Sequence, residues 1–244
     1  MSRSFVFLHG GGQGGWVWDD LIAALRLQGG ERIGACLVLD VVGCGKKRGR
    51  PTAEVEVADL IDDLLADIDA AALGSAILVG HSQAGTILPR LLKARPALFA
   101  QVVYVSCVAP IGEQTSLSWL HTMPGAETSA LGSASGPPPG SRERFRMGFC
   151  NDMAEAEAEA FLDQLGPDQW PASSYRMTGW DYDHLDAVPS TYVQCLKDMA
   201  LQPDWQAIFA ERLQARAIVH IDAGHQAMNT RPHALAEILR AAAR

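Results

Sequence analysis

Residues 76–85 read AILVGHSQAG and carry the strongest local signal in the sequence. A short apolar run, typical of a buried strand, ends at Gly80, and a pattern typical of a helix begins near Ile87. Ser82 therefore falls on a turn between a strand and a helix, with the small residues Gly80 and Ala84 two positions away on either side. A serine exposed on such a strained turn needs small neighbours, because larger side chains would clash with the crossing backbone. We interpret Ser82 as a nucleophile rather than as part of an ordinary glycine–serine turn.

Six short apolar runs alternate with helical patterns along the chain. The runs occupy residues 5–8, 35–39, 76–79, 102–105, 192–196 and 217–221. Strands that are apolar on both faces are typical of a parallel sheet covered by helices. Between the runs, apolar residues from Val57 to Ile68 repeat at the spacing of one helix face, and Thr52 is placed to cap that helix. The alternation predicts the α/β class, with a doubly wound, mostly parallel sheet of about six strands.

One region, residues 111–188, departs from this pattern. It contains no clear strand, a loop rich in Gly, Ser and Pro at 132–140, and an Ala- and Glu-rich helical stretch at 154–165. A connection between two strands is rarely this long. We therefore predict a core built from residues 1–110 and 189–244, with 111–188 inserted as a mostly helical lid.

The composition is that of a globular protein and argues against several partners. Of the 244 residues, 48% are hydrophobic, and 20 Lys and Arg stand against 28 Asp and Glu, which gives a net charge of −8. A nucleic-acid-binding protein needs a basic face, and the short basic run at 46–50 is interpreted as a solvated loop. No apolar stretch approaches the roughly 20 residues that span a bilayer. We expect no nucleic-acid partner and no membrane span, and the sequence leaves a homodimer open.

The five cysteines are scattered, and none has the spacing of a zinc or redox motif. Three of them, Cys36, Cys107 and Cys195, lie in apolar runs and are predicted to be small core residues. The N-terminus lacks the apolar run of about 7–15 residues that a signal peptide needs. The sequence therefore predicts a cytoplasmic protein in a reducing compartment, with no metal and no cofactor.

A serine hydroxyl is a weak nucleophile and needs a base, for which His225 is the best candidate. His225 lies just past the last predicted strand, beside Gly224, and the carboxyl ends of parallel strands share one edge of a sheet. The imidazole also needs a carboxylate that fixes its tautomer. Asp198 follows the fifth predicted strand and is favoured, whereas Asp204 is an alternative in a position suited to the first turn of a helix. The order Ser82, Asp198, His225 is typical of this class of site.

Residues 8–16 read LHGGGQGGW and follow the first predicted strand. Glycines let the backbone come close and aim N–H groups at developing negative charge. The backbone N–H groups of Gly11 and of Gln83, directly after Ser82, are the predicted oxyanion hole. The alternative is a loop that binds the phosphates of a dinucleotide, because residues 10–15 also fit a loose GxGxxG pattern. A dinucleotide site would explain neither the serine nor the histidine, so we favour the oxyanion hole.

The inserted region supplies candidates for a substrate pocket. Its aromatic residues and methionines favour a small, largely apolar substrate, although they could instead form the core of the insertion. We predict that Trp119, His121 and Trp180 line the pocket together with Gln226, which follows His225.

Four stretches of the chain resemble the α/β-hydrolase superfamily. They are HGGGQGGWVWDDL at 9–21, GHSQAG at 80–85, KDMALQPDWQ at 197–206 and AGHQAM at 223–228. The pattern is similar to that of plant-type methylesterases, hydroxynitrile lyases and bacterial carboxylesterases. The resemblance covers both ends of the core and does not cover the insertion.

The resemblance implies roles for five residues: a catalytic triad of Ser82, Asp198 and His225, with oxyanion donors at Gly11 and Gln83. Hydroxynitrile lyases of this group have a lysine directly after the histidine, where this chain has Gln226. The departure favours a carboxylesterase-type serine hydrolase that acts on small ester substrates through an acyl-enzyme. The alternatives are a hydroxynitrile lyase, a carbon–carbon or lactone hydrolase on the same scaffold, and a ligand-binding receptor with little turnover.

Overall fold

The computed structural model describes residues 2–242 and contains one six-stranded sheet in which neighbouring strands are parallel. The strands are β1 (Arg3–Leu8), β2 (Ile33–Leu39), β3 (Ala76–His81), β4 (Phe99–Val105), β5 (Ser190–Cys195) and β6 (Ala217–Ile221). Their order across the sheet is β2-β1-β3-β4-β5-β6. The chain thus starts inside the sheet, moves to one edge, and returns past β1 to build the other side. Each predicted run matches one strand, so the predicted α/β fold class is confirmed.

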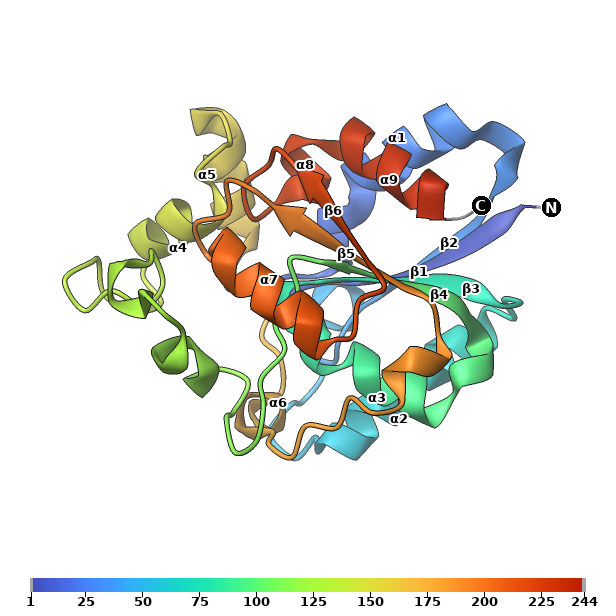
Figure 1. Ribbon diagram of the computed structural model, residues 1–244, viewed down its shortest axis with the longest axis horizontal. Helices are drawn as coiled ribbons and strands as arrows, with labels where there is room; N and C mark the ends of the chain where they lie inside the picture. Colours follow the sequence, from blue (N-terminus) through green and yellow to red (C-terminus); the bar gives the residue numbers. More distant parts are fainter. Residues whose placement is uncertain (1, 243–244) are drawn as a thin grey trace.

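Helices cover both faces of the sheet (Figure 1). They are α1 (Asp19–Gly29), α2 (Val57–Ala70), α3 (Leu88–Ala94), α4 (Arg142–Phe149), α5 (Glu155–Gln164), α6 (Ala172–Arg176), α7 (Pro203–Arg212), α8 (Ala227–Thr230) and α9 (Pro232–Ala242). In Figure 1, α1 and α9 lie together on one side of the sheet, and α2 and α3 lie on the other. Within residues 2–242, no helix is both long and apolar enough to cross a membrane.

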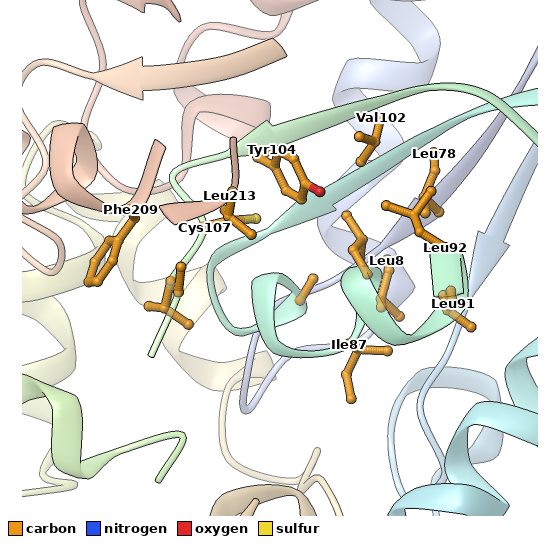
Figure 2. Close-up of a cluster of buried hydrophobic side chains, with 14 of the residues drawn as sticks. Leu8, Leu78, Ile87, Leu91, Leu92, Val102, Tyr104, Cys107, Phe209 and Leu213 are labelled. Carbon is orange, nitrogen blue, oxygen red and sulfur yellow. The ribbon is translucent and has the colours of Figure 1, made fainter. Parts of the chain in front are cut away.

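The strands are apolar on both faces because each face is buried. Alternate residues of a strand point to opposite faces, so Val6 and Leu8 of β1 pack in one layer with α2, α3 and α7, whereas Phe5 and Phe7 pack in the other with α1 and α9. Figure 2 shows part of the first layer, where strand side chains meet those of the segment that includes α3: Leu8, Leu78, Val102, Ile87, Leu91 and Leu92. Each fully buried side chain of this size contributes about 1.5–3 kcal/mol, which makes these layers the main source of stability.

The long segment between β4 and β5 carries α4, α5 and α6 and, in the part of the chain that the structure describes, no strand. Its helices α4 and α5 lie beyond the carboxyl ends of the strands in Figure 1. The loop rich in Gly and Pro is held by Arg144 of α4, whose buried guanidinium donates to the carbonyl oxygens of Leu131, Ser133 and Pro137. The bounds of a separate lid, residues 111–188, stay a prediction.

The predicted cap of α2 is wrong. The helix begins at Val57, and its N-cap is Glu56 rather than Thr52. The carboxylate of Asp59 accepts a hydrogen bond of 2.9 Å from the backbone N–H of Glu56. An acidic residue three positions past the cap therefore satisfies a free N–H at the helix start, as a capping box does.

The prediction that the basic run at 46–50 is a solvated loop is wrong for Lys47, whereas Lys46, Arg48 and Arg50 are exposed. Lys47 is buried, and its ammonium pairs with the carboxylates of Asp63 and Asp67 on α2. Arg48 pairs with the buried Asp168 of the inserted region at 2.7 Å. The run is part of the loop that follows β2, and these ion pairs join the loop to α2 and to the inserted region.

Candidate active site

Ser82 directly follows β3 and has a φ of +54°, in the left-handed region that non-glycine residues rarely adopt. Backbone strain of this kind is concentrated at functional sites. The neighbours must be small: a Cβ at Gly80 would lie 2.6 Å from Leu88 Cδ2, and a Cβ at Gly85 would lie 2.1 Å from the carbonyl oxygen of Val108. The turn therefore brings the serine to the carboxyl edge of the sheet on a sharply bent backbone.

His225 lies on the loop after β6 and reaches this serine. Its Nε2 is 3.0 Å from Ser82 Oγ, and its Nδ1 is 2.7 Å from Asp198 Oδ2. The side chains of His225 and Asp198 are almost completely buried. In a neutral imidazole that donates from Nδ1 to the carboxylate, Nε2 is left to accept the proton of the serine hydroxyl. The structure thus joins the three predicted residues in one chain of hydrogen bonds.

Asp198 is held by several donors besides the histidine. Its Oδ2 accepts from Ser106 Oγ at 2.6 Å and from Gln206 Nε2 at 3.4 Å. Its Oδ1 accepts from the backbone N–H groups of Ala200 and Leu201, each at 2.8 Å. These donors fix the carboxylate in the orientation that faces the imidazole. The sequence analysis missed Ser106 and Gln206, although a polar residue directly after the fourth apolar run is a signal that could have identified Ser106.

The alternative acid, Asp204, lies elsewhere. It is exposed in the first turn of α7, where a carboxylate interacts favourably with the helix dipole. No hydrogen bond or ion pair within residues 2–242 joins it to His225.

Two further histidines near the site are buried and have structural hydrogen bonds. His81 donates from Nε2 to the carbonyl oxygen of His225 at 2.9 Å. Burial, with repulsion from His225, holds the pKa of His81 well below its ordinary value. His9 donates from Nδ1 to the carbonyl oxygen of Gly10 and accepts from the backbone N–H of Val41. Burial lowers the pKa of His9 as well, so both rings are neutral near pH 7.

The glycine-rich loop after β1 lies against the turn that carries Ser82. β1 and β3 are neighbours at the point where the strand order reverses, which is the usual ligand position in open α/β sheets. A Cβ at Gly10 would lie 3.0 Å from Ser82 Cβ, and a Cβ at Gly11 would lie 2.1 Å from Gln83 Oε1. Gly11 and Gln83 both line the cavity described next. The loop comes this close to the serine at Gly10, where there is no side chain.

A cavity of about 680 Å³ opens over Ser82 and His225. This volume is within the range that small-molecule sites usually have. Most of the lining is apolar and comes from the inserted region, including Trp119, Leu131, Phe145, Phe149, Trp170 and Tyr175. The lining gives the site room for a molecule with a bulky apolar part.

Only one of the four predicted pocket residues lies in this lining. Trp119 lines the cavity and donates from Nε1 to the carbonyl oxygen of Ser116. His121 is exposed, and Trp180 donates to the carbonyl oxygen of Gln114. Gln226 is completely buried outside the lining. Aromatic content alone did not show which residues of the insertion face inward.

Asp168 is a buried carboxylate at the cavity that sequence reasoning missed. It accepts from Trp16 Nε1 at 3.0 Å, from the backbone N–H of Gly45 at 3.0 Å and from Arg48 Nε at 2.7 Å. Burial alone would raise the pKa of Asp168, but these hydrogen bonds outweigh it and lower the pKa below its usual range. A Cβ at Gly14 would lie 2.8 Å from its Oδ2. Asp168 therefore fastens the inserted region to the loops after β1 and β2.

Within residues 2–242, no three His, Cys, Asp or Glu side chains are grouped in a way that could hold a metal ion. The five cysteines, all in this part of the chain, are free thiols. Cys107 and Cys195 are buried in the core as predicted, whereas Cys36 is only partly buried.

Comparison with known proteins identifies the family. The sequence pattern of the alpha/beta hydrolase family matches residues 5–238, so this chain belongs to that family. The superfamily resemblance that the four sequence stretches indicated is confirmed.

Similar proteins include esterases. Over 109 residues the chain is 32% identical to probable esterase PIR7A of Oryza sativa subsp. indica; the match covers 44% of this chain and spans only 40% of the rice protein. Methylesterase 18 of Arabidopsis thaliana is 25% identical over a match 261 positions long, which covers 98% of this chain and 96% of that protein. The crystal structure of polyneuridine aldehyde esterase has a TM-score of 0.80 at 18% identity, over 100% of both chains, and shows that the fold is shared.

Proposed function

We propose that this protein is a serine hydrolase that cleaves carboxylic esters of small, largely apolar molecules. The observation that carries the proposal is the chain of hydrogen bonds from Ser82 through His225 to Asp198 beside the cavity. A serine, an imidazole and a carboxylate in this geometry can activate the serine hydroxyl for acyl transfer. The esterases among the similar proteins support the same reaction class.

In the first half of the reaction, Ser82 Oγ attacks the ester carbonyl carbon while His225 Nε2 takes the hydroxyl proton. The electron pair of the C=O bond moves to the oxygen, and this oxyanion accepts hydrogen bonds from the backbone N–H groups of Gly11 and Gln83. The carbonyl re-forms, the bond to the alkoxy oxygen breaks, and His225 gives its proton to the departing alcohol. Asp198 stabilises the imidazolium throughout.

In the second half, a water molecule attacks the acyl group on Ser82. His225 takes a proton from that water and later returns it to Ser82 Oγ as the acid leaves. The net change is the addition of one water molecule across the ester bond, and Ser82, His225 and Asp198 return to their starting protonation states.

The substrate is proposed from the cavity. Aromatic and aliphatic side chains of the inserted region surround most of it, which favours an apolar acid or alcohol part. We propose that residues 111–188 act as the lid of this site. Cyanohydrin cleavage is disfavoured because cyanide leaves as an anion, and the described residues that line the cavity include no Lys or Arg that would stabilise it.

The test combines labelling with two assays. A fluorophosphonate should modify Ser82, as mass spectrometry of the peptide would show, and should leave the Ser82→Ala variant unmodified. The purified protein should hydrolyse a short-chain nitrophenyl ester and release no cyanide from mandelonitrile above background. Cyanide release with weak ester turnover would replace the proposal by the lyase, and an unlabelled serine without turnover would replace it by the receptor.

A further inference from the structure

One short segment of the inserted region, residues 149–152, contacts both loops that carry the proposed base and acid. This segment begins at the last residue of α4 and continues toward α5. It comes from a part of the chain that lies between β4 and β5, whereas the two loops follow β5 and β6. None of these contacts can be read from the sequence, because the insertion has no motif that places it.

Phe149 contacts the imidazole of His225 directly. The two rings are stacked, with centroids 5.0 Å apart and planes 19° apart. His81 lies 4.6 Å from the same imidazole, between centroids, at an angle of 52°. Phe149 is itself stacked on Phe145, with a centroid distance of 5.5 Å. The imidazole is therefore confined by two aromatic rings, one from the core and one from the insertion.

The next two polar residues of the segment bind the backbone of both loops. Asn151 Nδ2 donates to the carbonyl oxygen of Lys197 at 2.8 Å, directly before Asp198. Asp152 Oδ2 accepts from the backbone N–H of Gly224 at 2.8 Å, directly before His225. One segment thus holds the residue that precedes the acid and the residue that precedes the base.

Gly224 makes this approach feasible. A Cβ at Gly224 would lie 2.4 Å from Asp152 Oδ1 and 2.7 Å from Asn151 Oδ1. The side chain of Asp152 is only 8% exposed, and its Oδ2 also accepts from Thr230 Oγ1 at 2.9 Å. Two donors therefore hold Oδ2 of this carboxylate, so it is a fixed support rather than a mobile surface group.

We propose that the 149–152 segment positions His225 and Asp198 for catalysis, so that the inserted region sets the geometry of the reaction in addition to covering the cavity. The proposal rests on the proposed function. Phe149 would fix the plane of the imidazole, while Asn151 and Asp152 would fix the loops on which the base and the acid stand. Catalytic geometry tolerates only about 0.5 Å and 10–20° of displacement, so loosening this segment lowers turnover without removing any group that reacts.

The first arm of the test separates turnover from binding. Asn151→Ala and Asp152→Ala remove contacts outside the cavity lining, so kcat should fall about 10- to 100-fold while KM for a nitrophenyl ester stays nearly constant. Asp152→Asn keeps an oxygen acceptor for Gly224 and should recover most of the loss. Phe149→Leu should lower kcat. Phe149→Tyr keeps the aromatic ring and should have nearly the kcat of the unmodified protein. Met147→Ala, on the exposed side of the same helix, is the matched control and should behave like the unmodified protein.

The second arm needs no activity. Proton NMR should show the downfield resonance of the His225 Nδ1 proton in its hydrogen bond to Asp198. In Phe149→Leu and Asp152→Ala this resonance should shift or broaden through faster exchange with water, whereas in Met147→Ala it should stay in place. This arm tests the positioning role even if the protein proves not to hydrolyse esters.

Two outcomes would overturn the inference. Asn151→Ala changes an exposed residue, and Phe149→Tyr keeps the aromatic ring. Both variants should therefore fold even if the other variants do not. Thermal unfolding checks that they do. If folded Asn151→Ala and Asp152→Ala match Met147→Ala in kcat and in the Nδ1 resonance, the segment does not position the site. If Phe149→Tyr is as slow as Phe149→Leu, the ring stack is not what Phe149 contributes.

Discussion

His225 Nε2 lies 3.0 Å from Ser82 Oγ, although 143 residues separate the two in the sequence. The distance follows from the topology. Ser82 comes directly after β3 and His225 lies on the loop after β6, and the carboxyl ends of parallel strands in one sheet share an edge. In the sheet β4 and β5 lie between β3 and β6. Asp198, from the loop after β5, binds the other nitrogen of the imidazole, Nδ1.

The first prediction concerns this pair. Ser82→Ala and His225→Ala should each lower kcat by several orders of magnitude, because the residues of a triad act as a unit. For the same reason the double variant should be little slower than either single one. Steady-state kinetics on one nitrophenyl ester measures all three, with circular dichroism as the control for folding. Losses that multiply in the double variant would show that the two residues act independently.

The second prediction separates the two candidate acids. Asp198→Asn should lower kcat by about 10⁴-fold, because the amide favours the wrong tautomer of the imidazole. Asp204→Asn should change kcat little, because that carboxylate is exposed in the first turn of α7. The two variants are assayed side by side on the same ester. A larger loss in Asp204→Asn would contradict the geometry found here.

The third prediction concerns stability at acidic pH. Burial lowers the pKa of His81 and of His9 below 6.5, their value in an unfolded chain. As the pH falls below 6.5, the unfolded chain takes up protons that the folded protein does not, so the free energy of unfolding decreases. Each histidine contributes a slope of up to about 1.4 kcal/mol per pH unit, from 6.5 down to its pKa in the folded protein.

Urea unfolding at several pH values between 7.5 and 5.5 measures this slope. His81→Gln keeps a donor for the carbonyl oxygen of His225 but does not titrate, so its stability should depend less steeply on pH than that of the unmodified protein. An identical slope in both proteins would show that His81 is protonated equally in the folded and unfolded states.

The fold could be predicted from the sequence because its signal is local and repeated. Each strand is a short apolar run, and each run is apolar throughout because helices bury both faces of the sheet. The bounds of α2 were predicted less well, because the acidic residues Glu56 and Asp59 cap that helix in place of the expected threonine. Several polar residues near a helix start can serve as a cap, and the sequence does not rank them.

The triad could be predicted for a similar reason. Ser82, Asp198 and His225 each stand next to a strand end, and the parallel topology brings such positions together. The surroundings could not be predicted, because they depend on how the insertion folds over the sheet edge. Asp168 and Phe149 lie in a region without strands or motifs, so nothing in the pattern shows that one binds Arg48 and the other His225. Likewise, Lys47 looked solvated because its partners on α2 are distant in sequence.

The last prediction concerns the attachment of the inserted region through Asp168. Removing this carboxylate leaves Trp16 Nε1 and the backbone N–H of Gly45 without their acceptor in a partly buried place. Asp168→Ala should therefore lower the free energy of unfolding by about 2–3 kcal/mol. Arg48→Ala should cost less than about 1 kcal/mol, because the arginine side chain is 47% exposed and water screens its ion pair. Urea unfolding at pH 7 compares the two variants directly. If Arg48→Ala lowered the free energy of unfolding as much as Asp168→Ala or more, the ion pair rather than the hydrogen bonds would fasten the inserted region to the loops beside the cavity.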